Sequence, residues 1–241
     1  MPKAEEIIDL RNRELSAQGN IRDLWQRTAD QMYPYVDITS MSTPGSVKTD
    51  EIYDMTPYLD MCDMVSGVKQ ILIPSGQPFF AIKIKGNKPN DISTRYTSLV
   101  TEISHEEIYK SNFITEFDEV LKPLIVFGLA SLYVDWTVKT GLNYKSPVIG
   151  TFQLLENARK IVDGIIVTVN YTARQAYEEF GDKVGQKVIE AYNDNKKQND
   201  MFEFIYLVRP RQFDPNKSQN YSMNMPFESC IVNVKEKLIV V

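Results

Sequence analysis

The stretch from Asp50 to Lys85 limits most strongly what this chain can fold into, because it reads as one continuous helix–turn–strand unit. Thr56 is a favourable N-cap, and Pro57 suits the first helical position, where a missing N–H costs nothing. Apolar side chains then recur along one helical face until Pro74 and Gly76 prevent the helix from continuing. These side chains are Tyr58, Met61, Cys62, Val65, Val68 and Leu72.

A strand is predicted to close this unit over residues 80–85. Phe80, Ile82 and Ile84 share one face of the strand, while lysines take the other face, as in a half-buried strand. The unit carries no catalytic group and therefore indicates a scaffold.

Helical patterns dominate the rest of the front half. Pro89-Asn90-Asp91 begins a helix whose apolar residues fall on one face, and Pro123 is expected to kink or end the regular part of the next helix. The residues of the first of these faces are Ile92, Tyr96, Leu99 and Ile103.

The rear half is predicted to be rich in β-structure. Asp163-Gly164 lies between two apolar pairs and indicates a two-residue hairpin turn. Thr172 and Gln175 have the spacing of a capping box, which predicts the start of a short helix. A later strand places Phe202, Phe204, Tyr206 and Val208 on one face. The fold class is therefore α+β, with a helical front half and a β-rich rear half.

Composition limits the function classes. At 241 residues, of which 43% are hydrophobic, the chain is able to bury one large core or two smaller ones. A formal net charge of −5 argues against a protein that grips nucleic acid through phosphate contacts, because such proteins are basic. Cys62 and Cys230 are expected to be reduced packing residues. No apolar run approaches the roughly 18 residues that span a bilayer, so no transmembrane segment is predicted.

Residues that carry chemistry are scarce. His105 is the single histidine, and its neighbours supply no second histidine at zinc-helix spacing, so we expect it on a helix surface. The sequence has no glycine-rich phosphate loop and no GxSxG nucleophile elbow. No catalytic, cofactor-binding or metal-binding residue is therefore predicted.

Four segments carry, in order, a resemblance to a known family. They are a tryptophan helix closed by an aromatic residue and a proline (24–34), the unit at 50–85, a helix from Ser111-Asn112-Phe113 through Phe127-Gly128 into a strand at 130–136, and Leu155-Glu156-Asn157 followed by Val162-Asp163-Gly164. This order resembles the head-to-tail connector, or portal, proteins of short-tailed bacteriophages.

The chain departs from the family pattern in two places. Ala158-Arg159-Lys160 replaces the family's glycine at the close of the Glu-Asn segment, so the turn there is expected to differ. Family members also continue well beyond Val241, and a strand over 238–241 would leave an apolar edge uncovered. We therefore expect the N-terminal part of a longer chain.

The resemblance implies a structural portal subunit rather than an enzyme, without cofactors. Such subunits form a ring, dodecameric in the full-length protein, at a capsid vertex, through which double-stranded DNA passes without sequence-specific binding. The implied partners are terminase, capsid or scaffold proteins and tail adaptor proteins, with no membrane contact. The implied location is the virion, with the host cytoplasm during assembly.

The resemblance also implies two regions and a contact site. Residues 1–192 would form a wing-like region, and residues 193–241 a β-rich, clip-like region that is truncated at its C-terminus. The partner-contact candidates in the clip-like region are Arg209, Arg211 and Phe213, since arginine suits planar carboxylate recognition. The alternative is that the two arginines simply flank a solvent-exposed Pro210.

Two other functions stay open. A small-molecule or glycan-binding α+β module without catalysis is favoured only by the many tyrosines and both tryptophans, which a core or an interface explains equally well. A hydrolase with dispersed carboxylates is compatible with the spacing, although no motif supports it.

Overall fold

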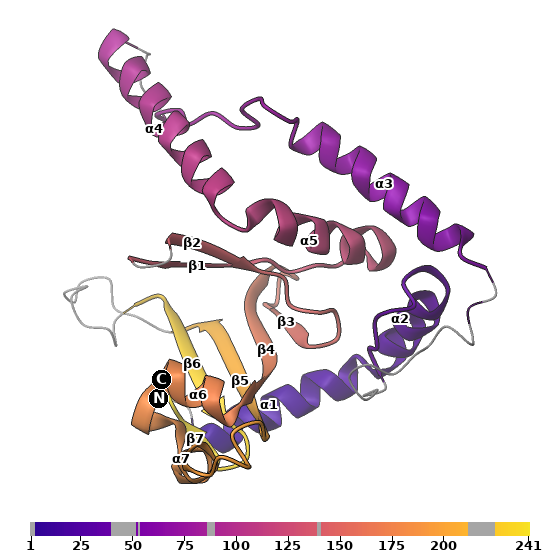
Figure 1. Cartoon of the computed structure of the whole chain (residues 1–241), viewed down its shortest axis with the longest axis vertical. Coiled ribbons are helices and arrows are strands. Elements are labelled where there is room, and N and C mark those ends of the chain that lie inside the picture. The colour runs from indigo at the N-terminus through magenta and orange to yellow at the C-terminus, as the bar shows by residue number, and fades with distance from the viewer. Residues whose placement is uncertain (1–2, 40–51, 53, 86–89, 139–140, 212–224) are drawn as a thin grey trace. The chain divides into compact units, whose positions relative to one another are not determined.

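A computed structural model describes residues 3–39, 52, 54–85, 90–138, 141–211 and 225–241. The chain forms two compact units, one of residues 23–149 and one of residues 1–22 with 150–241. The fold is α+β, with a helical front half and a strand-rich rear half, as predicted (Figure 1).

The unit of residues 23–149 is mainly helical. It holds most of α2 (Gly19–Met32), together with α3 (Thr56–Leu72), α4 (Asp91–Lys110), α5 (Phe113–Phe127), β1 (Tyr133–Thr137) and β2 (Gly141–Lys145). The two strands pair antiparallel in a small sheet.

The predicted helix after Asp50 is confirmed as α3, which packs against α5. Met61 and Val65 of α3 form a buried cluster with Leu121 of α5. Beside this cluster, Lys69 Nζ of α3 lies 2.5 Å from the carboxylate of Asp118 of α5. The predicted apolar face of α3 therefore packs against α5, except at Leu72, which is exposed.

The start of α3 differs from the prediction by one position. Thr56 is the first helical residue rather than the cap, and Met55 stands at the cap position without a side-chain bond. The Asp54 carboxylate accepts a hydrogen bond from the Thr56 backbone N–H at 2.9 Å. This contact holds the pKa of Asp54 below its usual range, because the hydrogen bond favours the charged carboxylate.

The prediction of a strand over residues 80–85 is wrong. This segment pairs with no strand in the described part of the chain; instead, side chains of α4 contact its backbone. The Ile82 N–H donates to Thr101 Oγ1 at 3.1 Å, and the Phe80 carbonyl lies 3.0 Å from His105 Nε2. Alternation of apolar residues indicates an extended backbone, but a strand also needs a neighbouring strand.

The second unit is built on a five-stranded antiparallel sheet in the order β3-β4-β5-β6-β7. Its elements are α1 (Ala4–Ala17), β3 (Phe152–Glu156), β4 (Val162–Thr172), α6 (Ala173–Phe180), the 3-10 helix η2 (Gly181–Val184), α7 (Gln186–Asn193), β5 (Met201–Pro210), β6 (Phe227–Asn233) and β7 (Leu238–Ile239). The strands of residues 193–241 therefore share one sheet with β3 and β4.

Strand β5 supplies both faces of the core, because successive side chains of a strand point to opposite sides of the sheet. Phe202 and Phe204 pack with α6 and α7, whereas Ile205 and Leu207 pack in a separate cluster that includes Ile7 of α1. Of the predicted strand face, Phe202, Phe204 and Tyr206 pack in this core, whereas Val208 is exposed. Helices thus cover both faces of the sheet.

The prediction of a hairpin turn at Asp163-Gly164 is also wrong, because both residues lie within strand β4. The chain turns earlier, where Asn157 N donates to Ile161 O at 3.0 Å. Lys160 adopts the left-handed region there, with φ of 58°. Gly164 instead lies opposite Leu155, next to a register shift between β3 and β4.

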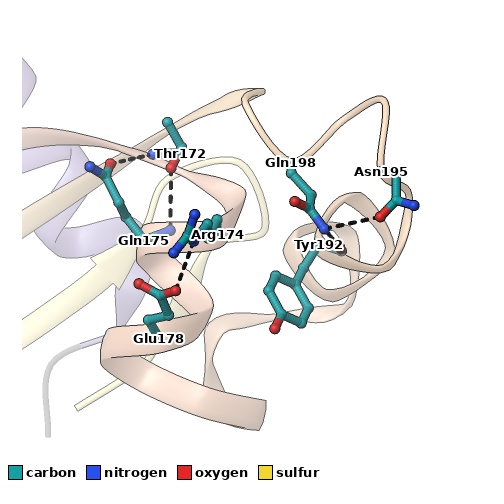
Figure 2. A network of polar contacts seen from close by, with 7 residues as sticks. All are labelled: Thr172, Arg174, Gln175, Glu178, Tyr192, Asn195 and Gln198. Carbon is teal, nitrogen blue, oxygen red and sulfur yellow. Dashed lines mark hydrogen bonds and ion pairs between the residues drawn. The ribbon is translucent and has the colours of Figure 1, made fainter.

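The capping box at the start of α6 is confirmed, and Figure 2 shows its two reciprocal hydrogen bonds. Gln175 N donates to Thr172 Oγ1 at 3.2 Å, while Thr172 N donates to Gln175 Oε1 at 3.0 Å. In the next turn, Arg174 Nε lies 2.8 Å from Glu178 Oε1. The cap fixes α6 directly at the end of β4.

Thr172→Ala should lower the free energy of unfolding by about 1 kcal/mol, because the backbone N–H of Gln175 loses its acceptor. Thr172→Ser keeps the hydroxyl and is the matched control. Guanidinium unfolding followed by circular dichroism measures both. An equal loss in the two variants would show that the cap is not responsible.

Gly164→Ala should destabilise the sheet by about 1–3 kcal/mol, since a methyl group there overpacks the core. The added Cβ would lie 2.9 Å from the Val208 carbonyl oxygen and 3.2 Å from Leu155 Cβ. Gly19→Ala is the control in the same unit, because no atom lies within 4 Å of its added Cβ. The same unfolding measurement should show a change below about 0.5 kcal/mol for the control.

Candidate partner-contact site at the end of β5

The pairing of β5 with β6 decides what surrounds the candidate arginines. Arg209 lies directly opposite Glu228, and Pro210 lies opposite Phe227. Arg209 Nε donates to Glu228 Oε1 at 2.6 Å, in an ion pair whose side chains are 36% and 13% exposed. The glutamate was not predicted, because a partner on another strand leaves no local signal in the sequence.

Arg211 follows the end of β5 and contacts the chain just before β6. Its backbone N–H donates to the Pro226 carbonyl at 2.9 Å, and its Nε donates to the Met225 carbonyl at 2.7 Å. These contacts hold Arg211 beside the chain that leads into β6. Phe213, the third candidate, lies outside the described residues.

Exposed apolar side chains surround the two arginines. Phe227 is 52% exposed, Met225 44% and Val208 36%. Aromatic residues, methionine and arginine are the residue types that are enriched in protein–protein interfaces. Sequence reasoning missed Phe227 and Met225, since neither belongs to a periodic pattern.

Cys230 lies beneath this surface, on β6. Burial raises the pKa of its thiol, and the nearby Glu228 carboxylate raises it further, although Arg209 and Arg211 act in the opposite direction. The thiol is therefore protonated at neutral pH. Cys230 and Cys62 are both free thiols.

A second feature is a groove of about 1210 Å³ between α4 and residues 76–84. His105 lies in its wall and is only 8% exposed, so the prediction of a surface histidine is wrong. Its ring stacks on Phe80, with ring centroids 4.1 Å apart. The sequence did not indicate this burial, because His105 lies outside the apolar stripe of α4.

The polar groups of the groove do not form a catalytic arrangement among the residues that the structure describes. His105 Nε2 donates to the Phe80 carbonyl, and Nδ1 has no hydrogen-bond partner there. The hydroxyls of Thr97 and Thr101 donate to helix carbonyls of Ser93 and Thr97 at 3.0 and 2.7 Å. No carboxylate or nucleophile is therefore paired with the imidazole.

In the described ranges of the chain, His, Cys, Asp and Glu side chains form no group of three that would hold a metal ion. None of the helices in these ranges combines the length and the apolarity that crossing a bilayer requires.

A family model for bacteriophage head to tail connecting proteins matches residues 5–241. The chain belongs to this family. Comparison with curated proteins gave no match. The match spans both compact units and confirms the resemblance that the four ordered segments carry. A head to tail connecting protein is a structural component of the phage virion that assembles with capsid and tail parts.

Reversing the charge of Arg209 tests whether the ion pair holds the β5–β6 end together. Arg209→Glu places two carboxylates opposite each other and should lower the free energy of unfolding by about 0.5–1 kcal/mol. Adding Glu228→Arg restores opposite charges and should recover most of the loss, as measured by thermal unfolding. A double variant no more stable than the single variant would contradict the pairing.

Proposed function

We propose that this connector protein is a portal subunit, and that its copies form a ring at a capsid vertex through which double-stranded DNA is packaged and ejected. The observation that carries the proposal is the match of the connector family over residues 5–241. The mechanism is geometric: identical copies joined head to tail through two different surfaces close a ring.

The charge of the chain supports a channel for passing DNA. A ring that lets a duplex slide must not hold its phosphates tightly, and a formal net charge of −5 agrees with that requirement. Binding by counterion release would call for a basic surface instead.

The surface at the end of β5 supports a role in assembly. Under this proposal Arg209, Arg211 and Phe213 contact a neighbouring subunit, the packaging motor or a tail adaptor. Because Arg209 already shares its charge with Glu228, a partner would meet an ion pair flanked by Phe227 and Met225, not a lone cation. Residues 193–241 would form the clip-like region and residues 1–192 the wing-like region.

The proposed portal function also implies the partners of this protein. Terminase would hydrolyse the ATP that drives packaging, so the portal itself needs no catalytic centre or cofactor. Capsid or scaffold proteins and tail adaptor proteins would bind the ring, which we propose to be dodecameric. Assembly would take place in the host cytoplasm before the ring enters the virion.

A small-molecule or glycan-binding module is the second candidate, and the groove beside α4 is the observation that favours it. Phe80 and Tyr109 line that groove together with hydroxyl groups. Aromatic faces next to hydroxyls suit a sugar ring, but no set of polar groups converges on one point among the described lining residues.

Negative-stain electron microscopy of the complete gene product tests the proposal. Rings with a central hole are expected, and symmetry averaging would give the number of subunits. Small particles without a hole at every protein concentration would contradict the ring. If a panel of simple sugars then gave saturable binding to the chain in titration calorimetry, the binding-module alternative would replace the ring proposal.

A further inference from the structure

The groove between α4 and residues 76–84 is a mainly apolar site on the unit of residues 23–149. It has a volume of about 1210 Å³, and Phe80, Ile82 and Tyr109 are among its lining residues. Ile82 is 38% exposed and Tyr109 is 43% exposed, so both present apolar surface to an occupant. Pockets for small molecules have volumes of roughly 300–1,000 Å³, so this groove suits a larger occupant.

One buried group in the wall of the groove lacks a partner. The imidazole of His105 donates through Nε2 to the Phe80 carbonyl, and its Nδ1 has no hydrogen-bond partner in the described part of the chain. A neutral imidazole that donates through Nε2 keeps Nδ1 as an acceptor. A buried acceptor without a donor costs free energy, so an occupant that brings an N–H group into the groove is favoured.

Strand β1 carries an exposed tryptophan on a different surface of the same unit. Trp136 is 61% exposed, and Val134, which shares its face of the strand, is 50% exposed. Neither residue lines the groove. The indole N–H of Trp136 has no hydrogen-bond partner among the described residues. Tryptophan is one of the residue types that dominate the binding free energy of protein–protein contacts.

The charges beside the two surfaces are complementary. Asp135 Oδ1 accepts the Trp136 backbone N–H at 2.8 Å, so the carboxylate lies at the base of the tryptophan side chain. Lys83 lines the groove and is exposed. Within the described ranges, neither Asp135 nor Lys83 forms an ion pair. A contact between the two surfaces would therefore bring an unpaired anion to an unpaired cation.

We propose that Trp136 of one copy of this chain inserts into the groove of the next copy. The indole would pack against Phe80, and its N–H is the donor that His105 Nδ1 lacks. At the rim of the groove, Asp135 would face Lys83. Because the inserted residue and the groove are different surfaces, the contact is head to tail and repeats from copy to copy.

This contact rests on the proposed portal function and adds to it the residues that join neighbouring subunits. A closed ring needs one surface on each copy that binds and a second surface that is bound. Trp136 and the groove supply one of each on the same compact unit. A two-fold pair would instead use one surface twice, and it would leave no free surface for a third copy.

Disulfide cross-linking between two cysteine variants tests the contact directly. Both variants carry Cys62→Ala and Cys230→Ala, and one adds Asp135→Cys whereas the other adds Lys83→Cys. Mild oxidation of the mixture should give a covalent dimer with one chain of each kind, and neither variant alone should cross-link above background. A chain with both new cysteines should give a ladder of dimers, trimers and larger oligomers, because the contact repeats.

Sedimentation velocity of the purified chain measures the contribution of each surface. Trp136→Ala should weaken self-association about 30-fold. Trp136→Phe keeps an aromatic ring but removes the N–H, so it should weaken self-association about tenfold. Ser98→Trp fills the groove from its wall and should act like Trp136→Ala. Ile71→Ala is the matched control, because Ile71 is 81% exposed and lies outside the groove; it should change nothing.

Circular dichroism verifies that every variant is folded. The contact is overturned if the mixed cysteine variants cross-link no more than each alone, or if neither Trp136→Ala nor Ser98→Trp weakens self-association. A chain that stays monomeric at every concentration and forms no cross-link overturns it as well. Negative-stain images of the complete gene product separate the two proposals. Rings that form equally well with Trp136→Ala would refute this contact alone, whereas cross-linked open chains without rings would refute the portal function alone.

Discussion

The antiparallel pairing of β4 with β5 is the interaction on which the sheet-containing unit depends. It runs from Ile165 opposite Val208 to Thr172 opposite Met201, and the two strands lie side by side in Figure 1. Because β5 is central, its alternate side chains anchor a helical layer on each face of the sheet. A one-residue slip would exchange these two sets of side chains and place each against the wrong layer. The capping box at Thr172 then begins α6 where this pairing ends.

Features set by a few neighbouring residues could be predicted from the sequence. Asn90 caps α4 by accepting the Ser93 N–H, and Thr172 caps α6 in the same way, because a short polar side chain satisfies an otherwise unpaired helix donor. The apolar face of α3 was also predictable, since helical periodicity is a local property. The order of such segments was sufficient to indicate the connector family before any tertiary contact was known.

Features that depend on distant residues were not predictable. The alternation at residues 80–85 gave an extended backbone, but only the structure shows that Thr101 and His105 occupy the place of a neighbouring strand. The glycine at position 164 suggested a turn, whereas its role is to let the Val208 carbonyl approach closely. The candidate arginines were located correctly on the β5 end, but Glu228, which decides the charge of that surface, lies on another strand.

The inward-facing hydroxyls and imidazole of α4 have a consequence for how that helix is oriented. Aliphatic contacts tolerate some rotation of a helix about its axis, because dispersion attraction has no direction. The hydrogen bonds that join Thr101 to the Ile82 N–H and His105 to the Phe80 carbonyl are directional, so they fix the rotation of the helix about its axis more strictly than an apolar contact would. Every copy of the chain therefore exposes the same side chains of α4, and they point in the same direction in each copy.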